Sequence, residues 1–242
     1  MDAGPLRSPL LGLALAAALA ALGASGVAAV KASLPLLGRS VTLDPGHGGI
    51  DSGARVAGVE EARLNLALAR AAASLLAADG AQVVLTRDSS AVRPRLDERP
   101  RLADATDGFV SIHVDSAATL ARGSQVFVGP HPRPSSVRLG EFLRRRLYAV
   151  THVLRPLNRT SSLAVLRRAR GAAVLVEVGF LSHPVERRLL LTRGYRARIA
   201  RAIYLGVRDY LAGLDASARE GAEMGPAALR WVILASEGEG RR

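Results

Sequence analysis

The chain has 242 residues, of which 49% are hydrophobic but only 4% are aromatic, and it contains no cysteine. This length is enough for one domain of about 150 to 200 residues with extra segments at its ends, and aliphatic side chains must fill its core. The lack of cysteine excludes disulfides and thiolate ligands, so any metal site must use histidine and carboxylate side chains.

The formal net charge of +12 predicts an anionic partner. We do not expect nucleic acid, because the chain has no recognition motif and few aromatic side chains on which bases could stack. Lys31 is the only lysine, so a compositional bias towards arginine would explain the same charge without a dedicated binding surface.

The two ends of the chain differ from its middle. Residues 9–30 form an uncharged run rich in alanine and leucine, with small residues near its end. We interpret residues 1–30 as a signal peptide or an N-terminal membrane anchor, since small residues suit a signal peptidase and about 20 apolar residues just span a bilayer. Residues 31–39 are predicted to be a linker, residues 40–214 the folded domain, and residues 215–242 a partly disordered tail.

The first part of the domain alternates between strand and helix. Residues 40–44 form a β-type segment that ends in a glycine-rich loop, and residues 61–79 place apolar side chains at helical spacing before Gly80. Residues 81–88 form the next predicted strand. A right-handed crossover should therefore join two parallel strands.

The second part continues this pattern. The apolar runs 108–115 and 172–180 predict strands in the middle of a sheet that is covered on both faces. The fold class is α/β, with a mainly parallel twisted sheet flanked by helices in a single domain. The other expected elements are a weak helix at 95–105, a strand at 123–129, a helix at 135–150, a short element at 162–167, and helices at 184–192 and 195–214.

Three side chains that can bind a metal occur where predicted strands end or helices begin. His47 follows the first strand, Glu61 begins the first helix, and His113 lies near the end of the third strand. All three can meet, because the carboxyl ends of parallel strands share one edge of the sheet. Two imidazoles and a carboxylate leave a fourth position open, as in catalytic zinc sites. Taken singly, they could also be a solvated loop histidine, a first-turn carboxylate and a core histidine.

Glu177 is the most informative acidic residue. It lies inside the otherwise apolar strand 172–180, where an unpaired charge would be expensive. A metal or a metal-bound water at the same sheet edge would give it a partner, and burial would raise its pKa into the range of a general acid or base. The alternative is a structural salt bridge to an arginine.

Five segments in this order resemble the zinc-dependent N-acetylmuramoyl-L-alanine amidases that cleave bacterial peptidoglycan: VTLDPGHGGIDSGA, EARLNLALA, VVLTRD, FVSIHVD and VLVEVGFLSHPVE. The resemblance covers about residues 41–210. Several linked motifs in register are far more specific than any one of them, so the resemblance favours the metal-binding interpretation of these residues.

The resemblance implies a role for each residue. His47, Glu61 and His113 would bind one catalytic zinc ion, and Glu177 would be the catalytic acid and base. Glu61 is selected over Glu60 because the family's glutamate ligand lies four residues before an asparagine, here Asn65. Asp44 is expected to orient the loop or a ligand histidine, and a turn-capping role for it stays open.

The implied reaction is hydrolysis of the amide between N-acetylmuramic acid and L-alanine by a zinc-activated water, with residues 40–214 as the catalytic domain. Its partner would be peptidoglycan, outside the cytoplasm in the periplasm or cell wall, with membrane anchorage through residues 9–30 and a protein activator both left open. The alternatives are a zinc peptidase that cuts the stem peptide itself, a catalytically silent wall-binding module, and a nucleic-acid binder. An accessible site is expected, because the stretch between His113 and Glu177 has little room for an added inhibitory helix.

Overall fold

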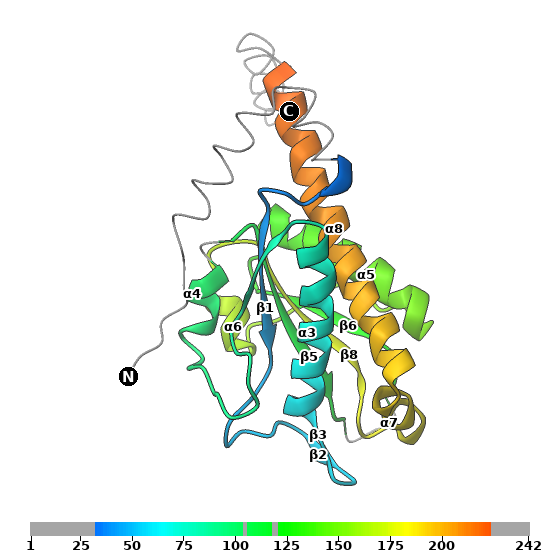
Figure 1. The fold of residues 1–242 in the computed structure, drawn as a ribbon. Coiled ribbons are helices and arrows are strands. Elements are labelled where there is room, and N and C mark those ends of the chain that lie inside the picture. The colour runs from blue at the N-terminus through cyan, green and yellow to red at the C-terminus, as the bar shows by residue number, and fades with distance from the viewer. Residues whose placement is uncertain (1–31, 104–105, 118–120, 224–242) are drawn as a thin grey trace, which may run out of the picture.

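The computed structural model describes residues 32–103, 106–117 and 121–223 (Figure 1). The segment interpreted as a signal peptide or anchor lies outside these residues. Among the helices described, none combines the length and the apolar character needed to cross a membrane.

A six-stranded sheet forms the centre of the domain, with strand order β4-β1-β5-β8-β6-β7. Neighbouring strands are parallel except for β6 and β8, which are antiparallel. The predicted α/β class with a mainly parallel sheet is therefore confirmed. The strands are β1 (Ser40–Pro45), β4 (Gln82–Leu85), β5 (Gly108–Asp115), β6 (Gln125–Val128), β7 (Asn158–Arg159) and β8 (Ala173–Phe180).

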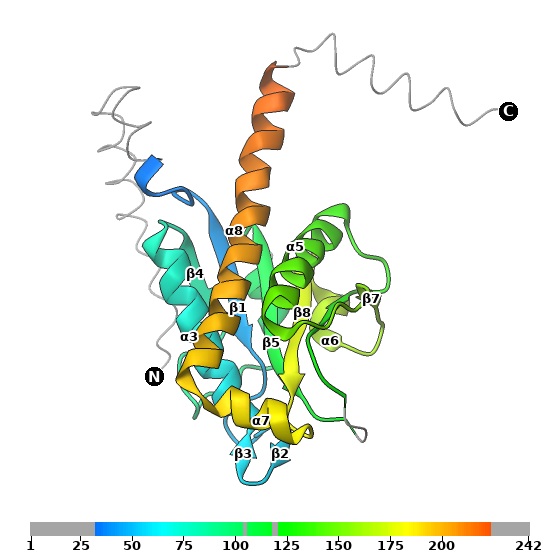
Figure 2. The ribbon, with the colours of Figure 1, turned by 90° about the vertical axis from the view of Figure 1, so that its right-hand side faces the viewer.

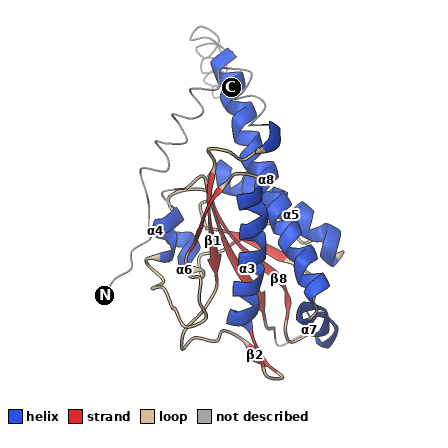
Figure 3. Cartoon of the chain, in the orientation of Figure 1, coloured by secondary structure: helices blue, strands red, loops and turns tan. Residues whose placement is uncertain are grey.

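Helices cover both faces of the sheet (Figure 3). On one face lie α3 (Glu61–Ala78), α5 (Pro134–Thr151) and α8 (Arg193–Glu223), and α7 (Pro184–Leu191) packs against α8. The other face carries the short helices α4 (Arg99–Ala103) and α6 (Ala164–Arg168). A two-stranded hairpin of β2 (Arg55–Val56) and β3 (Val59–Glu60) precedes α3.

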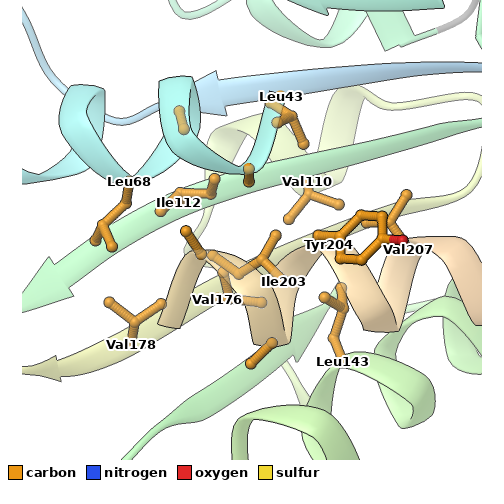
Figure 4. Packing of buried hydrophobic residues seen from close by; sticks show 14 of the residues in the cluster. Leu43, Leu68, Val110, Ile112, Leu143, Val176, Val178, Ile203, Tyr204 and Val207 are labelled. Atoms are coloured by element: carbon orange, nitrogen blue, oxygen red, sulfur yellow. The ribbon is translucent and has the colours of Figure 1, made fainter. Parts of the chain in front are cut away.

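The strands β5 and β8 have apolar side chains on both faces because both faces are covered. Val110 and Ile112 of β5 point into the larger core with Val176 of β8 and Ile203 of α8 (Figure 4). The alternate residues point the opposite way, where Phe109 and other apolar side chains pack against α6. This alternation also decides where His113 and Glu177 lie. His113 is an even number of residues from Phe109, and Glu177 from Leu175, so both side chains point to the same face of the sheet as the smaller cluster around Phe109.

Two segments extend the folded part beyond the expected limits of the domain. Leu36, within the segment predicted as a linker, is fully buried in the core, and its amide donates to Asp79 O at 2.9 Å. At the other end, the backbone of α8 continues past residue 214 to Glu223. The described chain starts, and α8 ends, at the end of the domain opposite the β2–β3 hairpin (Figures 1 and 2).

Candidate metal centre

His47 lies in the loop that leaves β1. Its backbone adopts a left-handed conformation, with φ of 61°, which is uncommon for a residue other than glycine and often marks a functional site. The imidazole Nδ1 lies 3.0 Å from Asp51 Oδ1, and Nε2 lies 3.2 Å from Glu61 Oε2. Asp51 thus fixes the ring by one nitrogen and leaves the other facing the centre of the site.

Glu61 is the first residue of α3, and the preceding loop holds it there. The amide of Glu61 donates to Ala54 O at 2.9 Å, which satisfies one of the free N–H groups at the helix start. Its carboxylate accepts from the Ala54 amide at 2.9 Å and lies 2.9 Å from His113 Nδ1. Burial acts to raise the pKa of Glu61, but hydrogen bonds from His113 and His47 outweigh burial and hold this pKa well below its ordinary value.

The neighbouring Glu60 takes no part in this cluster. Its carboxylate forms ion pairs with Arg63, at 2.8 Å, and with Arg55, on the solvent side of the hairpin. The choice of Glu61 over Glu60 therefore rests on side-chain direction as well as on the sequence pattern.

His113, near the end of β5, completes the group. One potential ligand atom each from His47, Glu61 and His113 lies within 4.8 Å of the other two, which is close enough for all three to hold one metal ion. Two imidazoles and one carboxylate are the ligand set of catalytic zinc sites that keep an open position. The structure thus brings together the three side chains predicted as ligands.

Two glycines allow the loops to approach these ligands. A Cβ atom at Gly46 would lie 2.2 Å from the His113 ring, and one at Gly53 would lie 2.5 Å from Glu61 Oε2. Real Cβ atoms do not approach other atoms so closely, so any side chain at either position would displace a ligand.

Glu177 projects from β8 at the position paired with His113 of β5. Among the described residues its Oε2 atom is buried without a hydrogen-bond partner. Burial raises the pKa of Glu177 well above its ordinary value, and the carboxylates of Asp115 and Glu61 raise it further. The alternative of a salt bridge to an arginine is not seen, since no ion pair of Glu177 occurs within the described part of the chain.

Two buried arginines hold the loop that carries His47. Arg87 is 2% exposed and donates to Gly46 O and to Ala62 O, both at 2.8 Å, so it ties this loop to the start of α3. Arg99 donates to His47 O at 2.9 Å and to Asp44 Oδ1 at 2.8 Å. Of the two roles considered for Asp44, this arrangement supports orientation of the loop, and it does so through Arg99 rather than by contact with a histidine.

A pocket of about 510 Å³ opens beside His47 and His113. The His47 side chain is 27% exposed and that of His113 is 18% exposed, so the pocket connects the ligand cluster with solvent. The other lining residues come from β1 and the loop that follows it, the loop between β4 and α4, the start of α4, and α6: Asp44, Asp51, Arg93, Pro94, Arg95, Leu96, Asp97, Arg99 and Val165.

Residues 41–209 match the family described as N-acetylmuramoyl-L-alanine amidase. The chain belongs to this family. It is 31% identical to the germination-specific N-acetylmuramoyl-L-alanine amidase of Bacillus subtilis, over 74% of this chain and 82% of that protein. It is also 30% identical to the amidase AmiA of Escherichia coli, over 73% of this chain and 78% of AmiA.

A solved amidase structure shares the fold. The CwlD amidase of Clostridioides difficile, determined in complex with the GerS lipoprotein, superposes with a TM-score of 0.68 and 29% identity. The match covers 72% of this chain and 98% of that one. Both the family and the single α/β domain predicted from the sequence are therefore confirmed.

Asp51, Arg87 and Arg99 were missed by the sequence analysis. Asp51 could have been found, because an acidic residue four positions after a loop histidine is a natural partner for its second ring nitrogen. Nothing local distinguishes the two buried arginines in a chain that contains so many.

Proposed function

We propose that this protein hydrolyses the amide bond between N-acetylmuramic acid and L-alanine in bacterial peptidoglycan, with zinc held by His47, Glu61 and His113 and with Glu177 as acid and base. The observation that carries the proposal is the position of Glu177, whose buried, unpartnered Oε2 lies on the strand position paired with His113. A purely structural carboxylate at this place would be costly.

The residues present suit zinc. The donor set contains no thiolate, offers one carboxylate between two imidazoles, and is oriented by Asp51 and by backbone amides. A zinc ion at this position would lower the pKa of a water molecule and stabilise negative charge on the scissile carbonyl oxygen.

Glu177 would act first as the general base and then as the general acid of the reaction. Its raised pKa suits a group that takes a proton from the attacking water and then gives it to the departing amine of L-alanine. His47 and His113 stay fixed in position during these steps, because Asp51 holds the first ring and Glu61 contacts both.

The test is the release of stem peptide from purified peptidoglycan by the full-length chain, with and without a chelator and with zinc added back. We expect zinc-dependent products with a free L-alanine amino group and a glycan free of peptide. Glu177→Gln should bind zinc stoichiometrically and lose turnover by at least about 100-fold. Peptides cut at an internal bond would identify a zinc peptidase instead, and absence of bound zinc would refute the proposal.

We also propose that the protein acts outside the cytoplasm, with peptidoglycan as its partner and residues 1–30 as signal or anchor. The complex of CwlD with the GerS lipoprotein supports a protein partner for this chain, and we propose that such a partner is an activator. Fractionation of producing cells, with the same chain lacking residues 1–30 as the control, tests the location. A purified chain that binds zinc but releases no peptide would favour the need for an activator.

A further inference from the structure

The pocket beside the ligand cluster has one wall formed by the loop between β4 and α4. Two glycines of the His47 loop fix the position of this wall. The Gly49 amide donates to Ser90 O at 2.8 Å, and a Cβ atom at Gly49 would lie 3.0 Å from Arg93 Cβ. At Gly48 a Cβ atom would lie 2.4 Å from Val92 O. Arg93 is therefore held next to the metal centre by close backbone packing.

Most charged groups of the pocket are already paired. Asp44 accepts hydrogen bonds from Thr86, Arg99 and Ser111 at 2.5, 2.8 and 2.7 Å. Arg95 is paired with Asp97 at 3.1 Å. Asp44 therefore has little capacity left for a ligand, and Asp97 already holds the Nε of Arg95.

Arg93 differs from them. Its side chain is 50% exposed, and its nearest acidic atom is Asp51 Oδ2 at 3.8 Å, beyond hydrogen-bond distance. No hydrogen bond of its guanidinium occurs within the part of the chain that the structure describes. The other oxygen of Asp51 is occupied by His47 and by the Gly53 amide, both at 3.0 Å.

The same pocket has an apolar side. Pro94, Leu96 and Val165 line it, and Leu96 is 56% exposed although it is a large aliphatic side chain. A ligand that fits has an aliphatic part next to a carboxylate, since guanidinium groups bind carboxylates through parallel hydrogen bonds.

We infer that this pocket binds the start of the stem peptide and that Arg93 recognises the free carboxylate of the D-glutamate that follows L-alanine. The inference rests on the proposed function, because the scissile bond must lie at the ligand cluster. The methyl group of L-alanine would face the apolar side. Arg93 thereby determines specificity between stem peptides that keep this carboxylate and those in which it is an amide.

The test measures binding without turnover. Full-length, zinc-loaded Glu177→Gln protein is titrated by calorimetry with two disaccharide tripeptides that contain D-glutamate or D-isoglutamine. We expect the D-glutamate form to bind about tenfold more tightly, as for a charge-assisted hydrogen bond. Adding Arg93→Ala should reduce this ratio to about one, and Arg93→Lys should keep part of it.

Arg95→Ala is the matched control, because it removes the same charge from the same pocket but from a guanidinium already paired with Asp97. Arg95→Ala should leave the ratio of the affinities for the D-glutamate and D-isoglutamine ligands unchanged. A ratio that Arg93→Ala leaves unchanged would overturn the inference, even if both ligands bind more weakly, since that result indicates an effect through Asp51. An equal loss in Arg95→Ala would overturn it too.

The experiments distinguish failure of the proposed amidase reaction from failure of the proposed carboxylate recognition by Arg93. If wild type releases stem peptide but the binding ratio does not depend on Arg93, only the carboxylate pocket is wrong. If the ratio depends on Arg93 but wild type does not cut the amide, the pocket stands and the proposed reaction is wrong.

Discussion

His113 and Glu177 are register partners on the parallel strands β5 and β8, and both point to the face of the sheet that carries α4 and α6. The strand pairing alone places a potential metal ligand next to a carboxyl group whose buried Oε2 has no hydrogen-bond partner among the described residues. Rigid strands in the centre of a sheet are a precise support for two groups that we propose act together.

This relationship predicts an unusual stability effect. In the metal-free protein Glu177→Gln should change the free energy of unfolding by less than about 1 kcal/mol, because within the described residues the buried Oε2 of wild type makes no hydrogen bond that the substitution could remove. Urea unfolding in the presence of a chelator measures this change. A loss of several kcal/mol would mean that Glu177 has a structural partner.

Asp51 should control metal affinity through His47. Asp51→Ala should weaken zinc binding by about 10- to 100-fold, since the imidazole loses the contact that fixes its orientation. Competition with a chromophoric chelator gives the affinity. Asp97→Ala is the control, because it removes another carboxylate of the same pocket that contacts arginines and no histidine. Equal weakening by both substitutions would show that general charge, and not ring orientation, matters.

Gly53 should be essential for the metal centre. Its φ is 64°, and the Cβ atom of Gly53→Ala would lie 2.5 Å from Glu61 Oε2, so the ligand must move and zinc binding should be lost. Gly58 offers a matched control: its φ is 76°, but a Cβ atom there meets nothing within 4 Å. Gly58→Ala should therefore bear only the backbone strain, about 1 kcal/mol, and still bind zinc. Stoichiometric zinc in Gly53→Ala would contradict the assigned geometry.

The buried ion pair between Arg99 and Asp44 should contribute strongly to stability. Their side chains are 4% and 1% exposed, so Arg99→Ala leaves a buried carboxylate unpaired and should cost about 3 to 5 kcal/mol. Arg101→Ala breaks an exposed pair with Asp97, which solvent screens, and should leave the free energy of unfolding almost unchanged. Denaturant unfolding of the two variants measures the loss in the free energy of unfolding for each. Similar losses would contradict the expectation that the buried pair contributes more than the exposed one.

The pH dependence of stability should include a contribution from Tyr204. Burial and then the hydrogen bond that its hydroxyl donates to Asp79 at 2.6 Å raise the pKa of Tyr204. The folded state therefore holds this proton more tightly, so the contribution is complete below about pH 10 and is lost as the pH rises further. Tyr204→Phe should be less stable by about 1 kcal/mol at pH 8. Above pH 10 its stability should fall less steeply than that of wild type, and parallel curves would contradict the assignment.

The central strands could be predicted from the sequence because each is a long apolar run that is buried on both faces. The segments predicted at 108–115 and 172–180 correspond to β5 and β8 almost residue for residue. The antiparallel direction of β6 could not be predicted, because no local pattern encodes which way a strand runs relative to its neighbour in the sheet. The length of α8 was also missed, since the apolar spacing ends near residue 214 while alanine and arginine continue to favour helix.

In the candidate site, the residues marked by a local sequence pattern could be predicted, and those that depend on contacts with distant segments could not. His47, Glu61, His113 and Glu177 stand at strand ends, at a helix start or in an apolar strand, and these positions can be read from the sequence. The burial of Arg87 depends on carbonyl groups that come from two other segments. Such a role emerges only when the chain has folded.

The placement of the two ends of the described chain has a practical consequence. Its first residues and the end of α8 both lie on the side of the domain away from the β2–β3 hairpin, whereas β1 ends and α3 begins, next to the predicted ligands His47 and Glu61, at the hairpin end. A support coupled next to residue 32 or residue 223 would therefore be attached on the side of the domain away from the predicted ligands. A solid, meshed substrate could then be presented to the immobilised protein without steric interference from its own attachment.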